Sequence, residues 1–401
     1  WGLAGKVLVT AVSLVVLTAA GYGWSTFRAL AGSIVTSDVL SDSTPRSGPP
    51  SRTITALVVG VDSRTDAQGR PLPQDVLDKM HAGPDDGQLN TDTIILLRIP
   101  ADPGKPVSYV KLAGDYGTHK INSAYGRAVT STTRTLQEQG LDADTVRKRA
   151  LDAGRKALVA TVTQLTGIVV DHYAEINLAG FVELTDAIGG VPVCLTEPVD
   201  DARYSGAVLP AGPQTLDGAN ALAFVRQRHG LEGGDLDRIT RQQAYMAGLA
   251  NTLLGGGRLA DPATVQRLLG IVGRYVVLDQ GWDLDQIVGQ VRQVSASEVE
   301  FHTIPTIRPD LYTPYDGVAV EVDTDAVRTF VRSTLDGLPV PTTSVSASGT
   351  RSAPPTTGTT APRTTIPRTT APITPAGGTP AGGATTTEPQ PITGATVPCV
   401  S

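Results

Sequence analysis

Residues 54–64, ITALVVGVDSR, carry the clearest sign of the fold class. They form a run of β-branched and other apolar residues that ends near Asp62, and such runs are typical of strands buried on both faces of a sheet. Residues 91–99, TDTIILLRI, repeat the pattern. The turn PADPG separates them from a third expected strand at 107–112, VSYVKL. A sheet with both faces covered therefore lies at the centre of the expected fold.

Helical patterns alternate with further strands after this sheet nucleus. Residues 142–167 begin with a candidate N-cap, Asp142, carry apolar residues at helical spacing and end at Gly167. A strand at 168–176 and a helix at 178–188 follow. The later elements are a strand at 191–195, helices at about 238–254, 263–276 and 284–294, a strand at 299–304 and a last helix at 323–337. This order predicts an α/β sandwich over residues 52–338.

Residues 7–24, VLVTAVSLVVLTAAGYGW, form an uncharged and mostly apolar stretch. Its length is about the minimum for a helix to cross the hydrocarbon core of a bilayer. We therefore predict a single transmembrane anchor over residues 1–28, with a cleaved signal peptide as the alternative. In both cases most of the chain is expected on the extracytoplasmic side, and an anchored chain would reside in the cell membrane.

Two segments of biased composition flank the expected domain. Residues 29–51 contain Ser, Thr, Pro and Gly with little apolar patterning, which predicts a linker. Residues 339–401 are rich in Thr, Pro and Gly and hold few apolar side chains. Such a stretch buries too little apolar surface to offset the entropy lost on ordering. We therefore expect a disordered tail.

The chain contains two cysteines, Cys194 and Cys399. In an exported protein the two could form a disulfide that ties the end of the tail to the domain. Alternatively, Cys194 in VPVCL is a small apolar strand residue and Cys399 is a free thiol. The spacing of the cysteines leaves both possibilities open, and no spacing of Cys and His indicates a metal site.

The formal net charge of −6 excludes the broad basic surface that duplex nucleic acids require. Against this background, residues 224–243, FVRQRHGLEGGDLDRITRQQ, hold Arg226, Arg228, Arg238 and Arg241 within sixteen positions. Positive charge concentrated in an acidic chain indicates local recognition of an anion.

The spacing within this cluster indicates a shared target. Arg238 and Gln242 are four positions apart in an expected helix and therefore lie on one face. Arg226 and Arg228 occupy alternate positions before a glycine-rich loop, and they face the same space if the loop folds back. Converging guanidinium groups repel one another unless an anion neutralises them, so a phosphate or pyrophosphate explains the cluster. The alternative is a solvated helix whose arginines pair with carboxylates such as Asp235.

Other candidate residues lie at the ends of expected strands or at a helix start. Asp92 begins the second strand, and Asp62 and Arg64 follow the first. Because open α/β sheets bind ligands at strand ends, the carboxylates could hold Mg²⁺ beside a phosphate that Arg64 also binds. Asp beside Thr also serves turns and caps. Lys120, in HKINSAYG, could meet the same anion or could belong to a helix N-terminus.

Several motifs, in this order, strongly resemble the LytR-CpsA-Psr family. They are LVVGVDSR, NTDTIILL, HKINSAYG, TGIVVDHYAEINLAGFVELTDAIGGVPVCL, LPAGPQTLDGANALAFVRQRHG and GGDLDRITRQQ. The resemblance spans about residues 57–243 and is greatest to members from mycobacteria and related actinobacteria. It implies an α-β-α sandwich with a central mixed sheet. It also implies an extracytoplasmic, membrane-anchored phosphotransferase that moves a glycopolymer from a polyprenyl-pyrophosphate carrier onto peptidoglycan.

The resemblance also implies roles for individual residues. Asp92 matches the aspartate that binds Mg²⁺ in the family, and Gln242 matches its associated glutamine. Arg226, Arg228 and Arg238 match the pyrophosphate-binding arginines, which would act in catalysis by stabilising the leaving group and the phosphoryl transition state. The prenyl chain would lie in an apolar groove between sheet and helices.

The chain departs from the family pattern at one motif. Family members carry Ile-Pro-Arg-Asp at the end of the strand before the Lys-Ile-Asn motif, whereas residues 107–122 read VSYVKLAGDYGTHKIN. RIPAD at 98–102 precedes that strand and cannot replace it. Asp115 or Asp62 could supply the missing metal ligand. Two alternatives to a transferase follow: a wall-associated protein that binds polyprenyl pyrophosphate with weak or no transfer, or a pyrophosphatase-like hydrolase.

Overall fold

The computed structural model describes residues 34–40, 53–338 and 392–401. Within these ranges it leaves out residues 84–88, 103–104, 113–114, 117–118, 232–234, 256–260 and 292. The expected transmembrane segment at 7–24 lies outside the described residues. None of the helices within the described ranges is long and apolar enough to span a bilayer. The anchor therefore stays a prediction.

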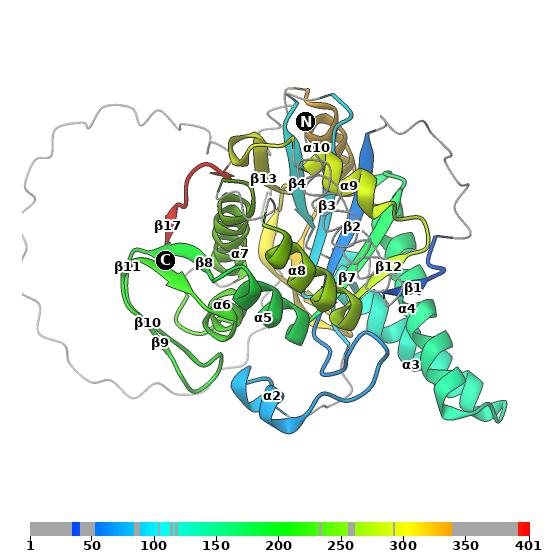
Figure 1. Cartoon of the computed structure of the whole chain (residues 1–401). Helices are drawn as coiled ribbons and strands as arrows, with labels where there is room; N and C mark the ends of the chain where they lie inside the picture. The colour runs from blue at the N-terminus through cyan, green and yellow to red at the C-terminus, as the bar shows by residue number, and fades with distance from the viewer. Residues whose placement is uncertain are drawn as a thin grey trace, which may run out of the picture. The chain divides into compact units, whose positions relative to one another are not determined.

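An eight-stranded mixed sheet forms the centre of the fold, with β2 near its middle (Figure 1). β2 pairs in parallel with β7 and antiparallel with β3, so the expected mixed sheet is confirmed. In spatial order the strands are β1 (Val35–Ser37), β12 (Val276–Asp279), β7 (His172–Asn177), β2 (Ile54–Val61), β3 (Thr93–Ile99), β4 (Val107–Leu112), β13 (Val299–Thr303) and β16 (Ile392–Thr393).

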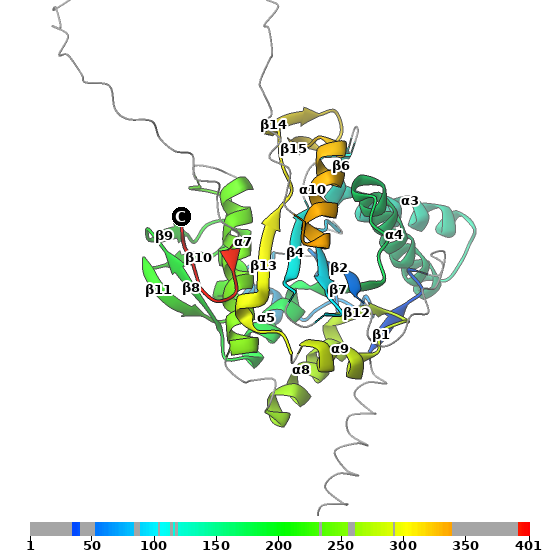
Figure 2. The ribbon, with the colours of Figure 1, turned by 90° about the horizontal axis from the view of Figure 1, so that it is seen from above.

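Helices cover both faces of this sheet, which confirms the α-β-α arrangement (Figure 2). One face is covered by α3 (Ala124–Glu138), α4 (Ala143–Thr166) and α10 (Thr324–Asp336). The other carries α5 (Leu178–Ala187), α6 (Gly218–Arg226), α7 (Asp235–Ala250), α8 (Pro262–Tyr275) and α9 (Leu284–Val291).

The residues of β2 explain why the sheet needs two layers of helices. Alternate side chains of a strand face opposite sides of the sheet. Leu57, Val59 and Val61 belong to the apolar core beneath α3, α4 and α10, and at most 3% of each residue is exposed. Ile54 belongs to the core beneath α7 and α9 on the other side. Because both faces are buried, an apolar run replaces the alternating pattern of a half-exposed strand.

The helix boundaries follow the capping signals in the sequence. The side chain of Asp142 accepts a hydrogen bond from the main-chain N–H of Thr145 at the start of α4, and Gly167 ends that helix with φ of 71°. Asn177 accepts a hydrogen bond from the N–H of Gly180 and so caps α5 directly at the end of β7. The two caps satisfy main-chain donors that the first helical turn leaves without partners.

Smaller elements surround the central layers. They include strands at the cavity end of the domain and a hairpin beside η1. In chain order they are α2 (Gln74–Lys79), β5 (Asp115–Tyr116), β6 (His119–Lys120), η1 (Ile121–Ser123), β8 (Val191–Leu195), β9 (Val199–Asp201), β10 (Ala207–Leu209), β11 (Gly212–Leu216), η2 (Asn251–Gly255), η4 (Ala296–Glu298), β14 (Arg308–Thr313), β15 (Gly317–Glu321) and β17 (Cys399–Val400).

Part of the segment expected to be a linker, residues 29–51, belongs to the sheet instead. Residues 35–37 form β1, which pairs in parallel with β12 at the sheet edge. Val39 is 3% exposed and packs into the core beneath α3 and α4. The short apolar and β-branched run IVTSDVL was too brief to predict a strand, but an open sheet edge supplies the hydrogen-bond partners it needs.

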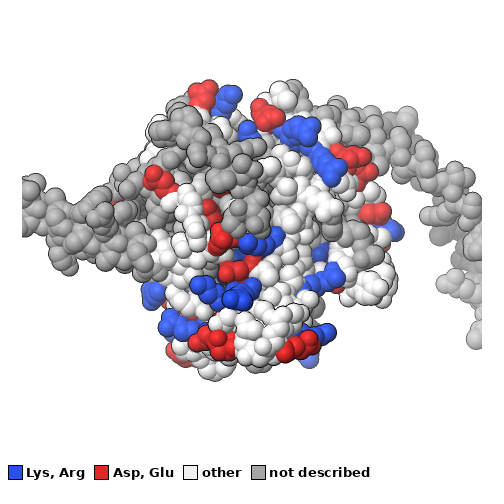
Figure 3. Space-filling model, turned by 90° about the vertical axis from the view of Figure 1, so that its right-hand side faces the viewer, with Lys and Arg blue, Asp and Glu red and all other residues white. Residues whose placement is uncertain are grey.

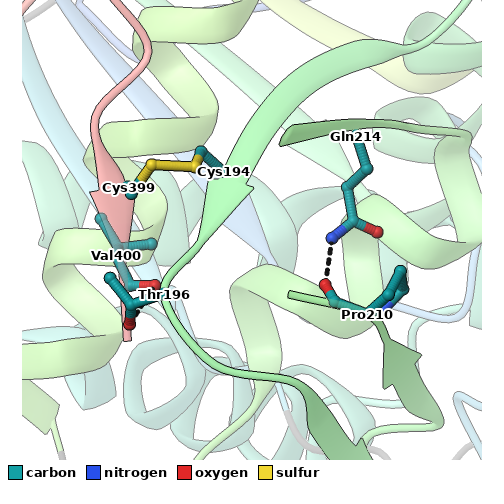
Figure 4. Close-up of a disulfide and its surroundings, with 6 residues drawn as sticks. All are labelled: Cys194, Thr196, Pro210, Gln214, Cys399 and Val400. Carbon is teal, nitrogen blue, oxygen red and sulfur yellow. Dashed lines mark hydrogen bonds between the residues drawn. A yellow bond between two sulfur atoms is a disulfide. The ribbon is translucent and has the colours of Figure 1, made fainter. Parts of the chain in front are cut away.

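The end of the expected disordered tail, residues 339–401, is likewise ordered on the domain. β16 pairs antiparallel with β13, and β17 pairs in parallel with β8. Cys194 and Cys399 form a disulfide with 4.3 Å between their Cα atoms (Figure 4). The main-chain oxygen of Val400 accepts the N–H of Thr196 at 2.8 Å. The covalent link and the backbone ladder together hold a segment whose own apolar content is small.

Candidate functional site

A cavity of about 350 Å³ lies where β2 and β7 end and β3 begins. β2 and β7 run in parallel, so their carboxyl ends meet at this edge of the sheet, as in other open α/β proteins that bind ligands there. The lining residues come from strand ends and from the elements around them. They are Gly60, Val61, Asp62, Asn90, Asp92, Thr93, Ile176, Asn177, Leu178, Phe181, Asp201, Tyr204, Ser205, Leu222, Val225, Arg226, Arg228, His229, Arg238 and Gln242.

The structure brings four predicted residues of the arginine-rich segment to this cavity. Arg226 is the last residue of α6, and Gln227 leaves the helix with φ of −55° and ψ of 134°. The chain therefore continues in extended form, and both Arg226 and Arg228 line the cavity. Arg238 and Gln242, one helical turn apart in α7, line it from the other side of the loop. The expectation that the two segments face one space is confirmed.

Gln242 lines the cavity and has a buried side-chain amide. Its Nε2 donates to the main-chain oxygen of Val225 at 3.1 Å, which fixes the orientation of the amide. Its Oε1 is buried and has no hydrogen-bond partner among the described residues. A buried acceptor without a donor costs free energy, so Oε1 of Gln242 is a polar atom that the contacts among the described residues leave unsatisfied.

Three carboxylates line the same cavity: Asp62, Asp92 and Asp201. The N–H of Asp62 donates to the oxygen of Asn90 at 2.9 Å, which ties the end of β2 to the segment before β3. Within the described part of the chain, no group of three or more His, Cys, Asp or Glu residues could hold a metal. Mg²⁺ commonly uses one or two carboxylates with phosphate and water oxygens, so the oxygen donors of Asp62 and Asp92 fit it.

Arg64, predicted to bind the pyrophosphate, does not line this cavity. Its guanidinium donates to the main-chain oxygen of Ala82 through Nε and Nη2, at 3.1 and 2.9 Å. Its Nη1 lies 3.4 Å from Oδ1 of Asp62. Arg64 is 8% exposed, so its charge is directed into the protein, where it positions Asp62 and the segment after α2.

Lys120, the other predicted anion ligand, does not line the cavity either. It ends β6, and its main-chain N–H donates to Oδ2 of Asp316 at 2.7 Å. The same oxygen accepts the hydroxyl of Ser123 at 2.8 Å and lies 3.3 Å from Nδ1 of His119. The segment HKINS therefore anchors the start of α3 to the β14–β15 hairpin, as the helix-start alternative suggested.

Replacing Asp316 with asparagine should lower the free energy of unfolding at pH 7 by about 1 to 2 kcal/mol. Burial alone would raise the pKa of Asp316, but the hydrogen bonds from Ser123 and Lys120 and the proximity of His119 lower it below its ordinary value of 3.8. A lowered folded-state pKa contributes stability above pH 3.8 that is lost as the pH falls through the folded pKa.

Urea unfolding of both chains at pH 7 and pH 3 tests this expectation. The difference between wild type and Asp316→Asn should shrink at the lower pH. Asp310→Asn, an exposed position on the same hairpin, is the control and should leave unfolding unchanged at both values. An equal difference at the two pH values would assign the effect to packing rather than to the charge.

Arg241, the fourth arginine of the segment, points away from the cavity. It is 1% exposed, and its Nη1 donates to the side-chain oxygen of Gln227, between the two cavity arginines. Its Nε donates to the main-chain oxygen of Ser401 at 2.5 Å, and its guanidinium lies 5.2 Å from the ring centre of Phe224. Burial lowers the pKa of Arg241 to about 10, against the opposing charges of Asp237 and Asp201. Arg241 thus connects the last strand to the cavity loop.

Sequence reasoning missed several polar or aromatic residues of the cavity. Among them are Asn90, Asp201, Tyr204, Ser205 and His229. His229 directly follows Arg228, so the arginine motif could have indicated it. Asp201 and Tyr204 lie in VDDARYSG, where nothing in the spacing distinguishes a cavity wall from an ordinary polar hairpin.

The absent Ile-Pro-Arg-Asp motif has no replacement in RIPAD. Arg98 lies in β3, pairs with Ser108 and forms an ion pair with Asp336 at 3.4 Å. The cavity lies at the opposite end of β3, which confirms that RIPAD is on the wrong side. The side chain of Asp115 lies outside the described residues. Asp62 is therefore the candidate second carboxylate that the structure places at the cavity.

A second cavity of about 450 Å³ lies between α3, α4 and the segment after β2. Its walls include Leu89, Val129, Val146 and Leu151. A smaller cavity of about 20 Å³ shares Val61 and Asn177 with the first cavity and shares Ser63, Thr65, Leu89 and Leu151 with the second. An apolar cavity thus lies close to the polar cavity, near the carboxyl end of β2.

A buried ion-pair network borders the small cavity. Arg155 of α4 binds both carboxylate oxygens of Glu175 on β7, at 2.9 and 3.0 Å. Glu175 also accepts the hydroxyl of Tyr173 at 2.8 Å, and Arg155 donates to Asp152 at 3.1 Å. The partners satisfy one another, and the network fixes α4 on the sheet beside both cavities.

Charge is mixed on one face of the protein. On the face shown in Figure 3, acidic and basic side chains among the described residues are interspersed and form no broad basic field. On this face, positive charge is therefore local rather than spread over a continuous surface.

The α-β-α domain thus places carboxylates at its strand ends and arginines from α6, α7 and the loop between them around one cavity. The chain matches the LytR_cpsA_psr family over residues 36–331 and belongs to this family. It is 45% identical over 287 residues to the cell wall biosynthesis protein LcpA of Corynebacterium glutamicum, which covers 70% of this chain and 55% of LcpA. The expected relationship to actinobacterial members is confirmed.

More distant relatives extend the comparison. The chain is 27% identical over 254 residues to the polyisoprenyl-teichoic acid--peptidoglycan teichoic acid transferase TagU of Oceanobacillus iheyensis, covering 62% of this chain and 67% of TagU. A crystal structure of protein gbs0355 from Streptococcus agalactiae superposes with a TM-score of 0.50 at 18% identity, covering 71% of this chain and 88% of that chain. The latter likeness shows the fold alone.

The match leaves much of the corynebacterial relatives uncovered. The chain spans 55% of the length of LcpA and 51% of the probable cell wall biosynthesis protein LcpB of the same organism. Family membership is therefore a property of the domain over residues 36–331.

Proposed function

We propose that the domain is a phosphotransferase that moves a glycopolymer from a polyprenyl-pyrophosphate carrier onto peptidoglycan. The observation that carries the proposal is the convergence of Arg226, Arg228 and Arg238 from two segments on a cavity that also presents Asp62 and Asp92. The names of the relatives support it, since LcpA is a cell wall biosynthesis protein and TagU a teichoic acid transferase acting on peptidoglycan.

The chemistry follows from the charges at the cavity. Three guanidinium groups bind the negatively charged oxygens of the pyrophosphate and hold it in one orientation. An acceptor hydroxyl of peptidoglycan attacks the phosphorus that carries the glycan, and its proton leaves to a base or to water. The bond from this phosphorus to the bridging oxygen breaks, and polyprenyl phosphate departs with the electron pair. The arginines stabilise the charge that develops on the leaving oxygen.

Mg²⁺ is the cofactor that the family resemblance implies. Asp92, with Asp62 as second ligand, would hold it beside the phosphate oxygens. Bound there, the ion would supply further positive charge to the phosphoryl group. Arg64 supports this arrangement by its contact with Asp62 at 3.4 Å, which positions the carboxylate without itself reaching the cavity.

The apolar cavity beneath α3 and α4 suits the prenyl chain of the carrier. Its volume of about 450 Å³ and its aliphatic walls favour a hydrocarbon over a polar ligand. The small cavity shares lining residues with both spaces, so the two lie near each other, as they must if one lipid occupies the apolar cavity while its pyrophosphate meets the arginines.

The proposed location is the extracytoplasmic side of the cell membrane, with a single-pass anchor at residues 1–28. Two observations support it. The disulfide between Cys194 and Cys399 suits an oxidising compartment outside the cytoplasm. Residues 7–24 have the length and apolar composition of a membrane-spanning helix.

A second candidate function rests on the departure from the family motif. Because residues 107–122 lack Ile-Pro-Arg-Asp, one arginine and one aspartate are missing beside the pyrophosphate. A wall-associated protein that binds polyprenyl pyrophosphate, with weak or no transfer, would need only the cavity and its arginines. Pyrophosphatase-like hydrolysis would use the same cavity with water in place of the acceptor hydroxyl.

A transfer assay separates these functions. The full chain is incubated with a carrier-linked glycan and peptidoglycan at increasing Mg²⁺ concentration, and both glycan on peptidoglycan and free sugar phosphate are measured. We expect Mg²⁺-dependent transfer, and Asp92→Asn should lower its rate by about tenfold or more because a charged ligand is lost.

Asp325→Asn, a fully exposed carboxylate on α10, is the matched control and should transfer at the wild-type rate. Carrier binding without any product would support the binding protein. Release of sugar phosphate in the absence of peptidoglycan would support the hydrolase. Transfer that is unaffected both by Mg²⁺ removal and by Asp92→Asn would remove the metal from the proposal.

A further inference from the structure

The β9–β10 turn forms one wall of the cavity and holds its residues firmly. The main-chain oxygen of Asp201 accepts the N–H groups of Tyr204, Ser205 and Gly206 at 3.1 to 3.2 Å. Oδ2 of Asp201 also accepts the N–H of Ser205 at 3.3 Å. Asp201 and Ser205 are buried, whereas Tyr204 is 57% exposed at the rim. The exposed side chain of Tyr204 therefore projects from a turn that several hydrogen bonds stabilise.

Tyr204 is part of an aromatic pair built from two separate segments. Its ring stacks on His229 with 3.7 Å between the ring centres and 19° between the planes. The guanidinium of Arg203 lies 5.7 Å from the centre of the Tyr204 ring. His229 directly follows Arg228 in the sequence, and Tyr204 and His229 both line the cavity. The pair, which we name the Tyr204–His229 platform, thus lies beside the proposed pyrophosphate site.

The turn that carries Tyr204 packs against the segment that follows α2. Gly206 has φ of +81°, and a Cβ atom on it would approach the ring of His81 to 2.6 Å. The turn therefore packs directly on His81. The main-chain oxygen of the next residue, Ala82, accepts two hydrogen bonds from Arg64. Because the fold orders Tyr204 in advance, a ligand stacking on it loses little extra side-chain entropy.

We propose that the Tyr204–His229 platform binds the first sugar ring of the carrier-linked glycan. This inference rests on the proposed function. The glycan is joined to its phosphate through an oxygen, so the first sugar ring begins two bonds beyond the phosphorus. Arg226 and Arg228 line the cavity, and His229, which directly follows Arg228, lines it beside them. The carbon-bound hydrogens of a sugar ring suit the electron-rich face of an aromatic ring.

The surrounding polar atoms favour a sugar over the prenyl chain at this rim. Sugar hydroxyls are donors and acceptors, and the polar side chains of Asp201, Ser205 and Gln242 belong to residues that line the cavity. A prenyl chain has no donor or acceptor with which to meet these side chains. The apolar side chains that suit the prenyl chain lie around the second cavity instead.

Calorimetric titration of the full chain with two defined ligands tests the platform. The probes are farnesyl pyrophosphate and the same lipid pyrophosphate carrying one N-acetylglucosamine. We expect wild type to bind the sugar-bearing lipid more tightly. Tyr204→Ala should weaken binding of the sugar-bearing lipid by about tenfold and change that of farnesyl pyrophosphate by less than about twofold. Tyr204→Phe should retain wild-type affinity for both.

Tyr312→Ala is the control, since Tyr312 is 74% exposed on the β14–β15 hairpin and does not line the cavity. Equal weakening of both lipids by Tyr204→Ala, or no gain in affinity from the sugar in wild type, would overturn the platform. If Tyr204→Ala instead raises only the KM for peptidoglycan, the platform binds the acceptor and the inference is wrong. Failure of wild type to bind even farnesyl pyrophosphate would contradict the proposed function itself.

Discussion

Replacing Arg228 with alanine is expected to lower the rate of glycopolymer transfer by about 10² to 10³-fold. Arg228 lines the cavity with Arg226 and Arg238 and is exposed, so the substitution removes positive charge at the pyrophosphate without opening a hole in a core. The free energy of unfolding should change by less than about 0.5 kcal/mol. Initial rates of transfer, measured beside urea unfolding, give both quantities.

Two further variants test whether the loss of activity depends on the position and the shape of this arginine. Arg332→Ala removes an exposed arginine from α10, on the opposite face of the sheet, and should transfer at the wild-type rate. Arg228→Lys keeps the charge but loses the planar fork of the guanidinium, so an intermediate rate is expected. Equal activity of wild type and Arg228→Ala would show that the arginines form a solvated surface rather than a pyrophosphate site.

Removing the disulfide through Cys194→Ser and Cys399→Ser together should lower the free energy of unfolding by about 5 kcal/mol. The bridge joins residues 205 positions apart and therefore restricts a very long loop in the unfolded chain. Thermal unfolding of the double variant should begin roughly 10 °C below that of the oxidised wild type. Wild type kept in a strong reductant should approach the variant, and reductant should leave the variant unchanged.

The same variant should also lose transfer activity below its unfolding temperature. Ser401 follows the bridged strand and accepts a hydrogen bond from Arg241, which in turn donates to Gln227 between the two cavity arginines. Release of β17 removes one partner of this buried guanidinium and loosens the loop that carries Arg226 and Arg228. A variant that unfolds earlier yet transfers at the wild-type rate at low temperature would show that the loop is positioned without β17.

The elements that the sequence predicted are those with strong local signals. The strands β2 and β3 and the capped helix α4 could be predicted directly, because burial and capping require particular residue types at neighbouring positions. β1, β16 and β17 could not, because strands of two or three residues owe their order to partners far along the chain. The cysteine pairing needed the same long-range information.

The site residues were predictable where their spacing within one helix fixed the direction in which their side chains point. Arg238 and Gln242 lie one helical turn apart and share the cavity as expected. Arg64 and Lys120 have the right chemistry for an anion, but the turn after β2 directs Arg64 to Ala82, and Asp316 holds the segment around Lys120. The wall formed by Asp201 and Tyr204 depends on hairpin packing, for which the sequence carries no periodic signal.

The docking of β16 and β17 changes what the Thr/Pro-rich segment can reach. Its two ends, after Leu338 and before Ile392, both belong to the folded domain. Whatever path it takes, the segment must return, so its farthest point can stand only about 90 Å from the domain, half the span of a one-ended arm of equal length. A single proteolytic cut within it would leave both halves joined to the domain, and only cleavage followed by reduction and unfolding would separate them.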